Sequence, residues 1–137
     1  MIGQLYINDK DAFATWGAYL EEGSENVLLL PASNKEYASN NARSQHGKQV
    51  FRRTPRKSDR DVILYFCIAA SNRDEYLQKY EAFVNELDSD MVTMKVPSLK
   101  KIYKLDALSY QDLSFFDYIG KFAVKFNEPN PKDRISL

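Results

Sequence analysis

Two stretches in the second half of the chain have hydrophobic patterns that predict their structure. In Asp61–Ala69 apolar side chains occupy both alternating sets of positions, which predicts a central β-strand with apolar residues on its two faces. After the capping residues Ser71 and Asn72, apolar residues recur at the spacing of one helix face. They are Tyr76, Leu77, Tyr80, Phe83, Val84 and Leu87. The pattern therefore predicts an amphipathic helix over about residues 72–88.

Shorter apolar runs predict further strands at Gln4–Asn8, Val27–Leu30, Met91–Val96, Ile102–Leu105 and the alternating Tyr118–Asn127. The aromatic segment around Phe13 and Trp16 is expected to be an irregular segment or a single turn that places both rings in the core. Ser109–Phe116 is expected to be a loop or turn. The fold class predicted from these elements is α+β, a mostly antiparallel β-sandwich or barrel with one packed helix.

Residues 32–58 follow neither pattern. Polar residues dominate from Ala32 to Gln49, and two prospective strand residues, Val50 and Phe51, are followed at once by a basic run. A loop of this length is uncommon in a compact domain unless it is functional or disordered. We expect a long protruding arm over about 32–58, inside a single domain of residues 1–131 with a short tail at 132–137.

Length and composition exclude several classes of protein. The 137 residues, 44% hydrophobic and 28% charged, suit one globular domain. The chain opens without a charged start and an apolar run, so no signal peptide is expected. Its longest apolar run, Val62–Ala70, is far below the ~20 residues that span a bilayer, so no membrane partner is expected. The single cysteine cannot form an intrachain disulfide.

Residues with catalytic potential do not form a recognisable site. The single histidine, His46, lies two positions from Ser44 in the polar arm, where the two would not hold the fixed geometry that a base and a nucleophile need. Cys67 lies in the middle of a predicted strand, where a thiol behaves as a small buried apolar group with a raised pKa. No metal-ligand spacing and no phosphate-binding glycine loop is present. We expect no catalytic residue, metal or cofactor, and hence no enzyme.

The charged residues are strongly segregated although their sum is zero, with 19 basic and 19 acidic residues. The basic stretch 43–60 has seven basic residues against Asp59, a net charge of +6. Residues 74–90 have a net charge of −5, residues 9–25 of −4, and the lysines at 95–104 add +4. The candidates for a subunit interface are Arg43, Lys48, Arg52, Arg53, Arg56, Lys57 and Arg60 on the basic side, and Glu75, Glu81 and Glu86 on the acidic helix.

Three interpretations of this segregation are open. The charges could be solvated faces without a partner, which is the usual fate of a charge run. The basic stretch 43–60 could bind nucleic-acid phosphates, as a nucleic-acid-binding module does. Basic and acidic surfaces of identical subunits could also meet in a head-to-tail contact, which closes into a ring if the rotation allows it. The zero net charge favours the last interpretation over the second.

The order of these features resembles one known family. The resemblance rests on six segments, namely Leu5–Asn8, Trp16–Leu20, Asp61–Ile68, Tyr76–Phe83, Val96–Lys104 and Gly120–Pro129. In this order they look like the amino-terminal, tail-tube-like domain of siphovirus distal tail proteins, the phage tail component family. The resemblance covers most of the chain and rests on pattern and order, without an invariant signature.

The resemblance implies a structural role in a phage or prophage tail. Family members form hexameric rings at the junction of tail tube and tail tip, and the genome passes through the channel that they enclose. The expected partners are thus other copies of this chain and other tail proteins, with nucleic acid as channel content. The expected location is the virion tail, and the host cytoplasm before assembly. Many family members continue into a second domain that binds carbohydrate, so receptor binding is not inferred from a chain that stops at Leu137.

Overall fold

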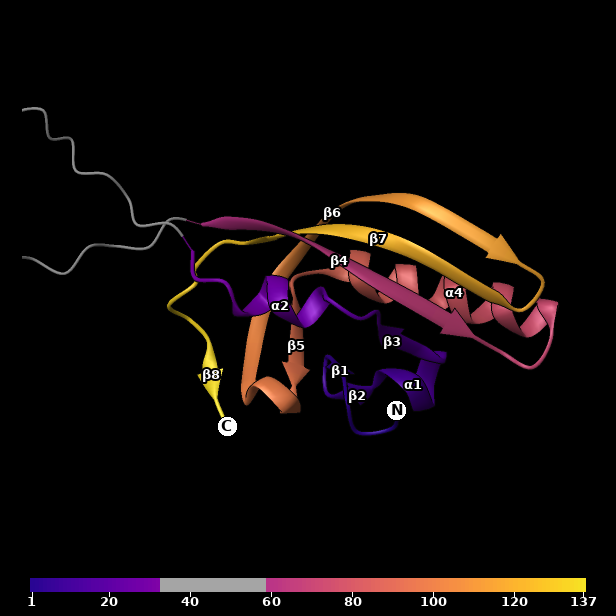
Figure 1. The fold of residues 1–137 in the computed structure, drawn as a ribbon, viewed down its shortest axis with the longest axis horizontal. Coiled ribbons are helices and arrows are strands. Elements are labelled where there is room, and N and C mark those ends of the chain that lie inside the picture. The colour runs from indigo at the N-terminus through magenta and orange to yellow at the C-terminus, as the bar shows by residue number, and fades with distance from the viewer. Residues whose placement is uncertain (33–58) are drawn as a thin grey trace, which may run out of the picture.

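The strands of the protein form one curled, mainly antiparallel sheet, which confirms the predicted α+β class (Figure 1). The computed structural model describes residues 1–32 and 59–137, so the predicted arm lies outside the described residues except for Ala32. In chain order the elements are β1 (Tyr6–Ile7), β2 (Lys10–Asp11), α1 (Ala12–Trp16), β3 (Ala18–Leu20), α2 (Ser24–Leu29), β4 (Arg60–Ala69), α4 (Arg73–Ser89), β5 (Val92–Val96), the 3₁₀ turn η1 (Pro97–Leu99), β6 (Lys101–Phe116), β7 (Ile119–Glu128) and β8 (Ile135–Ser136).

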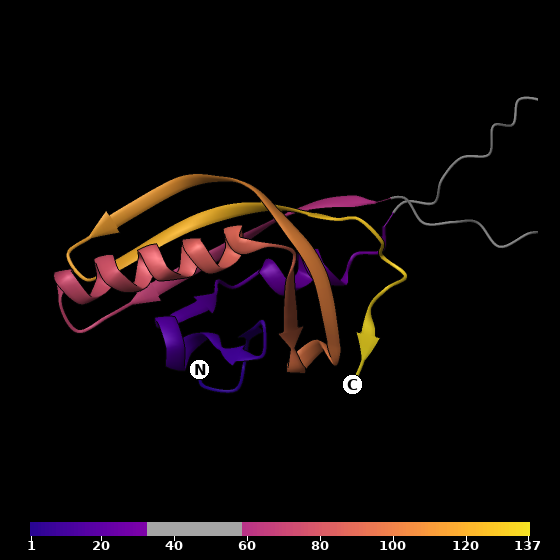
Figure 2. The same ribbon diagram turned by 180° about the vertical axis from the view of Figure 1, so that it is seen from behind.

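The long strand β6 joins the two parts of the sheet. Its first residues, Lys101–Leu105, pair with β5, and from Asp106 onward it pairs with β7. The strand order is β2-β1-β5-β6-β7-β4-β3, with β8 paired to the start of β6. Because β6 bends between its two partners, the sheet curls into a half-barrel over α4 (Figure 2).

Strands β4 and β7 are neighbouring inner strands of the sheet, and both were predicted as strands from the sequence. They pair over ten residues each, from Arg60↔Glu128 to Ala69↔Ile119. In β7, Phe122, Val124 and Phe126 are buried while Lys121 and Lys125 lie on the other face. This is the period of two that a half-buried strand shows.

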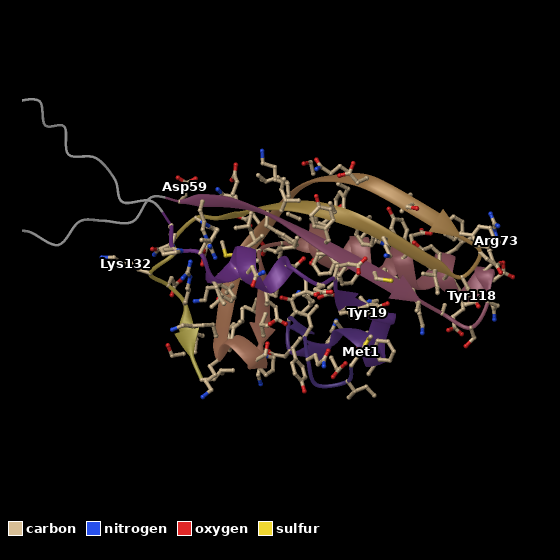
Figure 3. All side chains as sticks on the ribbon, in the orientation of Figure 1. Met1, Tyr19, Asp59, Arg73, Tyr118 and Lys132 are labelled. Carbon is tan, nitrogen blue, oxygen red and sulfur yellow. The ribbon has the colours of Figure 1, made fainter. Side chains whose placement is uncertain are left out.

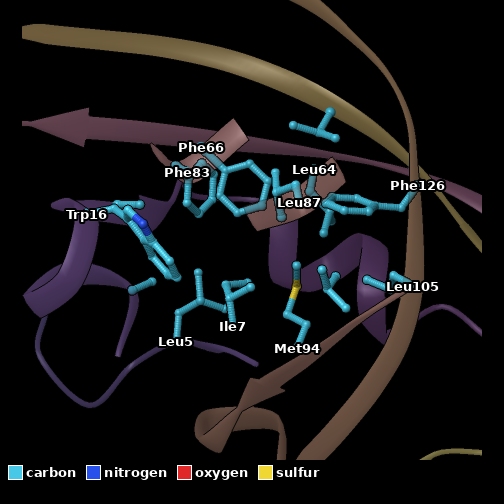
Figure 4. Close-up of a cluster of buried hydrophobic side chains, with 14 of the residues drawn as sticks. Leu5, Ile7, Trp16, Leu64, Phe66, Phe83, Leu87, Met94, Leu105 and Phe126 are labelled. Atoms are coloured by element: carbon cyan, nitrogen blue, oxygen red, sulfur yellow. The ribbon is translucent and has the colours of Figure 1, made fainter. Parts of the chain in front are cut away.

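Helix α4 packs against the concave side of the sheet. It begins where the capping residues predict, because the Asn72 side chain accepts a hydrogen bond from the Glu75 N–H at 2.8 Å. Phe83 and Leu87 of its apolar stripe are buried, and Phe83 meets Phe66 of β4 edge-to-face at 5.2 Å between ring centroids. Trp16 contacts the same Phe83 ring at 5.4 Å. These aromatic contacts form the centre of the core (Figure 4).

The aromatic segment around Trp16, expected to be an irregular segment or a single turn, is the five-residue helix α1. Asp11 caps α1 by accepting a hydrogen bond from Ala14 N–H at 2.9 Å, and this bond lowers the pKa of Asp11. Gly17 ends the helix at φ 65°, and a Cβ there would lie 2.3 Å from the Ala69 carbonyl oxygen. Glycine is therefore required at this position. Trp16 is buried as expected, whereas Phe13 is only half-buried.

Two predictions of secondary structure were wrong. Val27–Leu30 is not a strand, because residues up to Leu29 belong to α2, which buries Leu28 and leaves Leu29 and Leu30 exposed. Ser109–Phe116 is not a loop but the second half of β6. Two register shifts, between Ala107 and Ser109 and between Gln111 and Ser114, break the alternation that identifies a strand in sequence. Beyond the expected boundary at 131, β8 pairs with Lys101 and Ile102.

Tyr76 gives a prediction about the packing of α4. Its hydroxyl is buried without a hydrogen-bond partner among the described residues, and burial raises the pKa of Tyr76 to about 12. Since no hydrogen bond is lost, we expect Tyr76→Phe to leave the free energy of unfolding unchanged or raise it by about 1 kcal/mol, as measured by urea denaturation. Tyr110→Phe is the matched control, because the Tyr110 hydroxyl donates to Asp88 at 2.6 Å. That variant should lose about 0.5–1.5 kcal/mol, and an equal loss in both variants would contradict the assignment.

Candidate subunit interface

The ten interface candidates fall into two groups in the structure. Six of them lie outside the described residues, as do Ser44 and His46; these six are Arg43, Lys48, Arg52, Arg53, Arg56 and Lys57. The remaining four are Arg60 at the start of β4 and Glu75, Glu81 and Glu86 on α4. Of these four side chains, Glu81 is exposed and the other three are partly buried.

Arg60 is directed into its own chain. Its side chain is 9% exposed, and its Nε pairs with the Glu128 carboxylate at 2.5 Å. The rest of the guanidinium donates to backbone carbonyls of the α2 segment, from Nη1 to Val27 at 3.2 Å and to Leu30, and from Nη2 to Leu28 at 3.1 Å. These are the last carbonyls of α2, which have no partner within the helix. Arg60 therefore holds α2 against the start of β4 and does not contribute to an outer basic surface.

Glu128 is the centre of a buried ion-pair cluster that the sequence patterns did not reveal. It is 1% exposed and is paired with both Arg60 and Arg134, which donates from Nε at 2.7 Å and from Nη2 at 2.8 Å. Burial alone raises the pKa of Glu128, but the hydrogen bonds from Arg134 and Arg60 outweigh it and keep this pKa below its usual value. Both guanidinium groups also lie near the Tyr103 ring, at 5.9 and 5.1 Å. The cluster joins β4, β7 and the segment before β8.

Two of the three acidic candidates on α4 have partners within the chain. Glu86 accepts hydrogen bonds from Asn8 Nδ2 at 2.6 Å and from Lys10 Nζ at 3.1 Å, and these bonds lower its pKa. Glu75 pairs with Lys79 at 3.2 Å and accepts from the Ser71 N–H. The outer face of α4 is therefore less available to a basic partner than its net charge suggests.

Cys67 occupies the position expected for an inert thiol. It is 1% exposed on the face of β4 opposite Phe66, and burial raises its pKa. Its hydrogen bond with Tyr19 of the neighbouring β3 is the main cause that raises the pKa of Tyr19 to about 12. Within residues 1–32 and 59–137, no group of three or more His, Cys, Asp and Glu side chains could hold a metal ion. None of the helices described there has the length and apolar character to cross a bilayer.

In the part of the sheet formed by β6, β7, β4 and β3, the two outer strands have open edges among the described residues. From Asp106 to Phe116, β6 pairs only with β7, and on the other side of this part β3 pairs only with β4. Leu108 and Leu113, which lie at the two register shifts of β6, are exposed. An open strand edge has backbone donors and acceptors available to another strand. Sequence reasoning missed the β6 edge because it interpreted this segment as a loop.

Exposed apolar side chains also gather where β6 turns into β7. We use the name hairpin tip for Leu113, Phe116, Tyr118 and Ile119, all of which are exposed. Phe116 is 84% exposed, more than any other large apolar side chain described. A hollow of about 340 Å³ lies at this end and is lined by Ser114, Phe116, Tyr118, Ile119 and Lys121. The tip lies beside the start of α4 (Figure 3), where the Ala70 N–H donates to the Tyr118 carbonyl.

Comparisons of the chain with models of known protein families, with curated proteins and with solved structures gave no match. The interface candidates therefore rest on the sequence pattern and on the geometry described above.

Proposed function

We propose that this protein is a structural subunit of a phage or prophage tail, and that its copies associate head to tail into a ring. The observation that supports the ring most directly is a pair of unlike open edges in the β6-β7-β4-β3 part of the sheet, residues 106–116 of β6 on one side and β3 on the other. A contact between two different surfaces leaves one of each free on every added copy. Such a contact closes into a ring when the rotation between neighbours divides a full turn.

The order of sequence segments supports the tail as the place of this ring. The resemblance to distal tail proteins suggests six subunits at the junction of tail tube and tail tip, in contact with other tail proteins. The segregation of charge also agrees with self-association, because the chain contains basic and acidic segments of similar size. The function proposed is the construction of a tail channel, without catalysis.

Light scattering across protein concentration and salt tests the ring. We expect a mass of several subunits at high concentration and low salt, which falls as salt screens the charged contacts. Leu108→Lys should reduce this association strongly, because a lysine on an open edge opposes strand pairing. Leu137→Lys is the control with similar exposure, 55% against 53%, at a site outside the open edge of residues 106–116. A strictly monomeric protein under all these conditions would contradict the proposal.

A further inference from the structure

The hairpin tip has the chemistry of a receptor for arginine side chains. Phe116 and Tyr118 present exposed aromatic surfaces, and the carboxylates of Asp112 and Asp117 are exposed in the same hairpin. Asp74 adds a third exposed carboxylate from the first turn of α4, which begins at this end of the molecule (Figure 3). A guanidinium group can stack on an aromatic ring while it pairs with a carboxylate.

The basic side chains at this end are already engaged. Lys121 pairs with Glu21 at 3.3 Å, and the Arg73 guanidinium lies 5.0 Å from the centre of the Phe115 ring. The contact of Arg73 shows that aromatic rings at this hairpin accept guanidinium groups from the same chain. The exposed carboxylates around the tip therefore leave it with acidic character, and its large apolar side chains lack a cover among the described residues.

The chain itself contains a segment with the complementary composition. Residues 43–58 include six basic residues, four of them arginine, and no acidic residue. Phe51 precedes Arg52 and Arg53, so an apolar side chain accompanies the positive charges. Charge complementarity and apolar content thus match this segment to the tip.

The position of the tip favours a segment from another copy. The described residues nearest to the segment in sequence, Ala32 and Asp59, lie before β4, whereas the tip lies at the other end of β4 and β7 (Figure 1). Ten residues of strand separate these ends by about 33 Å. A contact between the segment of one copy and the tip of the next leaves a free segment and a free tip at the ends of the assembly.

We propose that the hairpin tip is the docking site for residues 43–58 of a second copy of this chain. This inference rests on the proposed function, because it supplies a second head-to-tail contact between subunits. Arginine side chains of the segment would stack on Phe116 and Tyr118 and pair with Asp112, Asp117 and Asp74. The outer face of α4, with the exposed Glu81, is the alternative site to which the basic segment could bind.

Disulfide trapping between two full-length variants tests the site. Thr54→Cys is mixed with Tyr118→Cys under mild oxidation, and in parallel with Gln78→Cys, which places a thiol on the exposed face of α4. We expect the mixed dimer with Tyr118→Cys to form at least several-fold faster than the one with Gln78→Cys. Faster trapping by Gln78→Cys, or equal rates, would overturn the proposal. A further variant carries both Thr54→Cys and Tyr118→Cys in one chain. If its disulfide forms only within single chains, the role of the second copy is overturned.

A second variant separates this site from the ring itself. Adding Phe116→Ala to the Tyr118→Cys protein should slow trapping several-fold without loss of folded protein by circular dichroism, because Phe116 is 84% exposed. Unchanged trapping would overturn the role of Phe116. If light scattering still gives a mass of several subunits while Tyr118→Cys is not trapped, the docking site is wrong and the proposed ring stands. Trapping at the tip in a protein that never exceeds a dimer would support the site and contradict the ring.

Discussion

Replacing Glu128 by glutamine is expected to lower the free energy of unfolding by about 3–5 kcal/mol. The carboxylate is 1% exposed and pairs with two guanidinium groups, those of Arg60 and Arg134. Glutamine keeps the size of the side chain but removes its charge, so both arginines would remain partly buried without a counterion. Arg60 would also hold the carbonyls of α2 less firmly. Urea denaturation near neutral pH measures the loss.

The pH dependence of this loss follows from the lowered pKa of Glu128. A carboxylate whose pKa is lower in the folded than in the unfolded protein adds stability above its unfolded pKa, ordinarily 4.5. That contribution disappears as the pH falls through the lower, folded value. The difference between wild type and Glu128→Gln should therefore be largest near neutral pH and shrink as the pH falls below 4.5. Glu81→Gln is the control, because Glu81 is exposed, and it should change stability little.

Phe66→Ala is expected to have an effect of similar size, a loss of about 3–5 kcal/mol. The ring is fully buried in β4 and contacts Phe83 of α4, Phe122 and Phe126 of β7 at centroid distances of 5.2, 6.0 and 6.2 Å. Alanine would leave a cavity between the helix and the sheet that these large rings cannot fill by small shifts. The midpoint of thermal unfolding should fall by about 10–20 °C in calorimetry.

The neighbouring residue supplies the matched control for this prediction. Tyr65 belongs to the same strand but points to the opposite face and is 46% exposed. Tyr65→Ala removes a side chain of similar size without opening a cavity, so its cost should be about 1 kcal/mol. Equal losses at the two positions would mean that strand propensity dominates over packing in β4.

The parts of the fold that could be predicted are those in which local pattern and tertiary environment agree. In α4 the capping residue, the acidic first turn and the apolar stripe all specify the same helix. In β7 the inward residues Phe122, Val124 and Phe126 are apolar and most outward positions are polar, so the period of two identifies both the strand and its buried face. Such agreement between the local sequence pattern and the tertiary environment is typical of segments whose structure is specified locally.

The failures occurred where tertiary contacts decide the structure. Val27–Leu30 is uniformly apolar, and such a run can be strand or helix; the contact of Ser24 with the backbone of Tyr65 fixes α2 against β4. In the second half of β6 the extra residues at the register shifts disturb the period, and only the pairing with β7 reveals the strand. Neither contact can be recognised from the residues of the segment itself.

The candidate interface was only partly predictable for the same reason. Counting charges locates basic and acidic segments but does not show which charged side chains form ion pairs within the folded chain. Arg60 was counted with the basic stretch, although its partner Glu128 lies 68 residues away. The hairpin tip was missed because Phe116 was assigned to a loop and Tyr118 and Ile119 to an alternating strand, and only the structure shows that their exposed side chains lie together at one turn.

The attachment of Arg60 to α2 has a consequence for variation in chain length. One guanidinium holds the end of the segment before residues 33–58 against the start of the strand after it. The two anchoring points are therefore fixed by the domain, whatever lies between them. Loop-closure entropy grows only with the logarithm of length, so doubling the intervening stretch costs about 0.6 kcal/mol. Insertions or deletions there can alter the reach and specificity of the subunit while the folded domain keeps nearly its full stability.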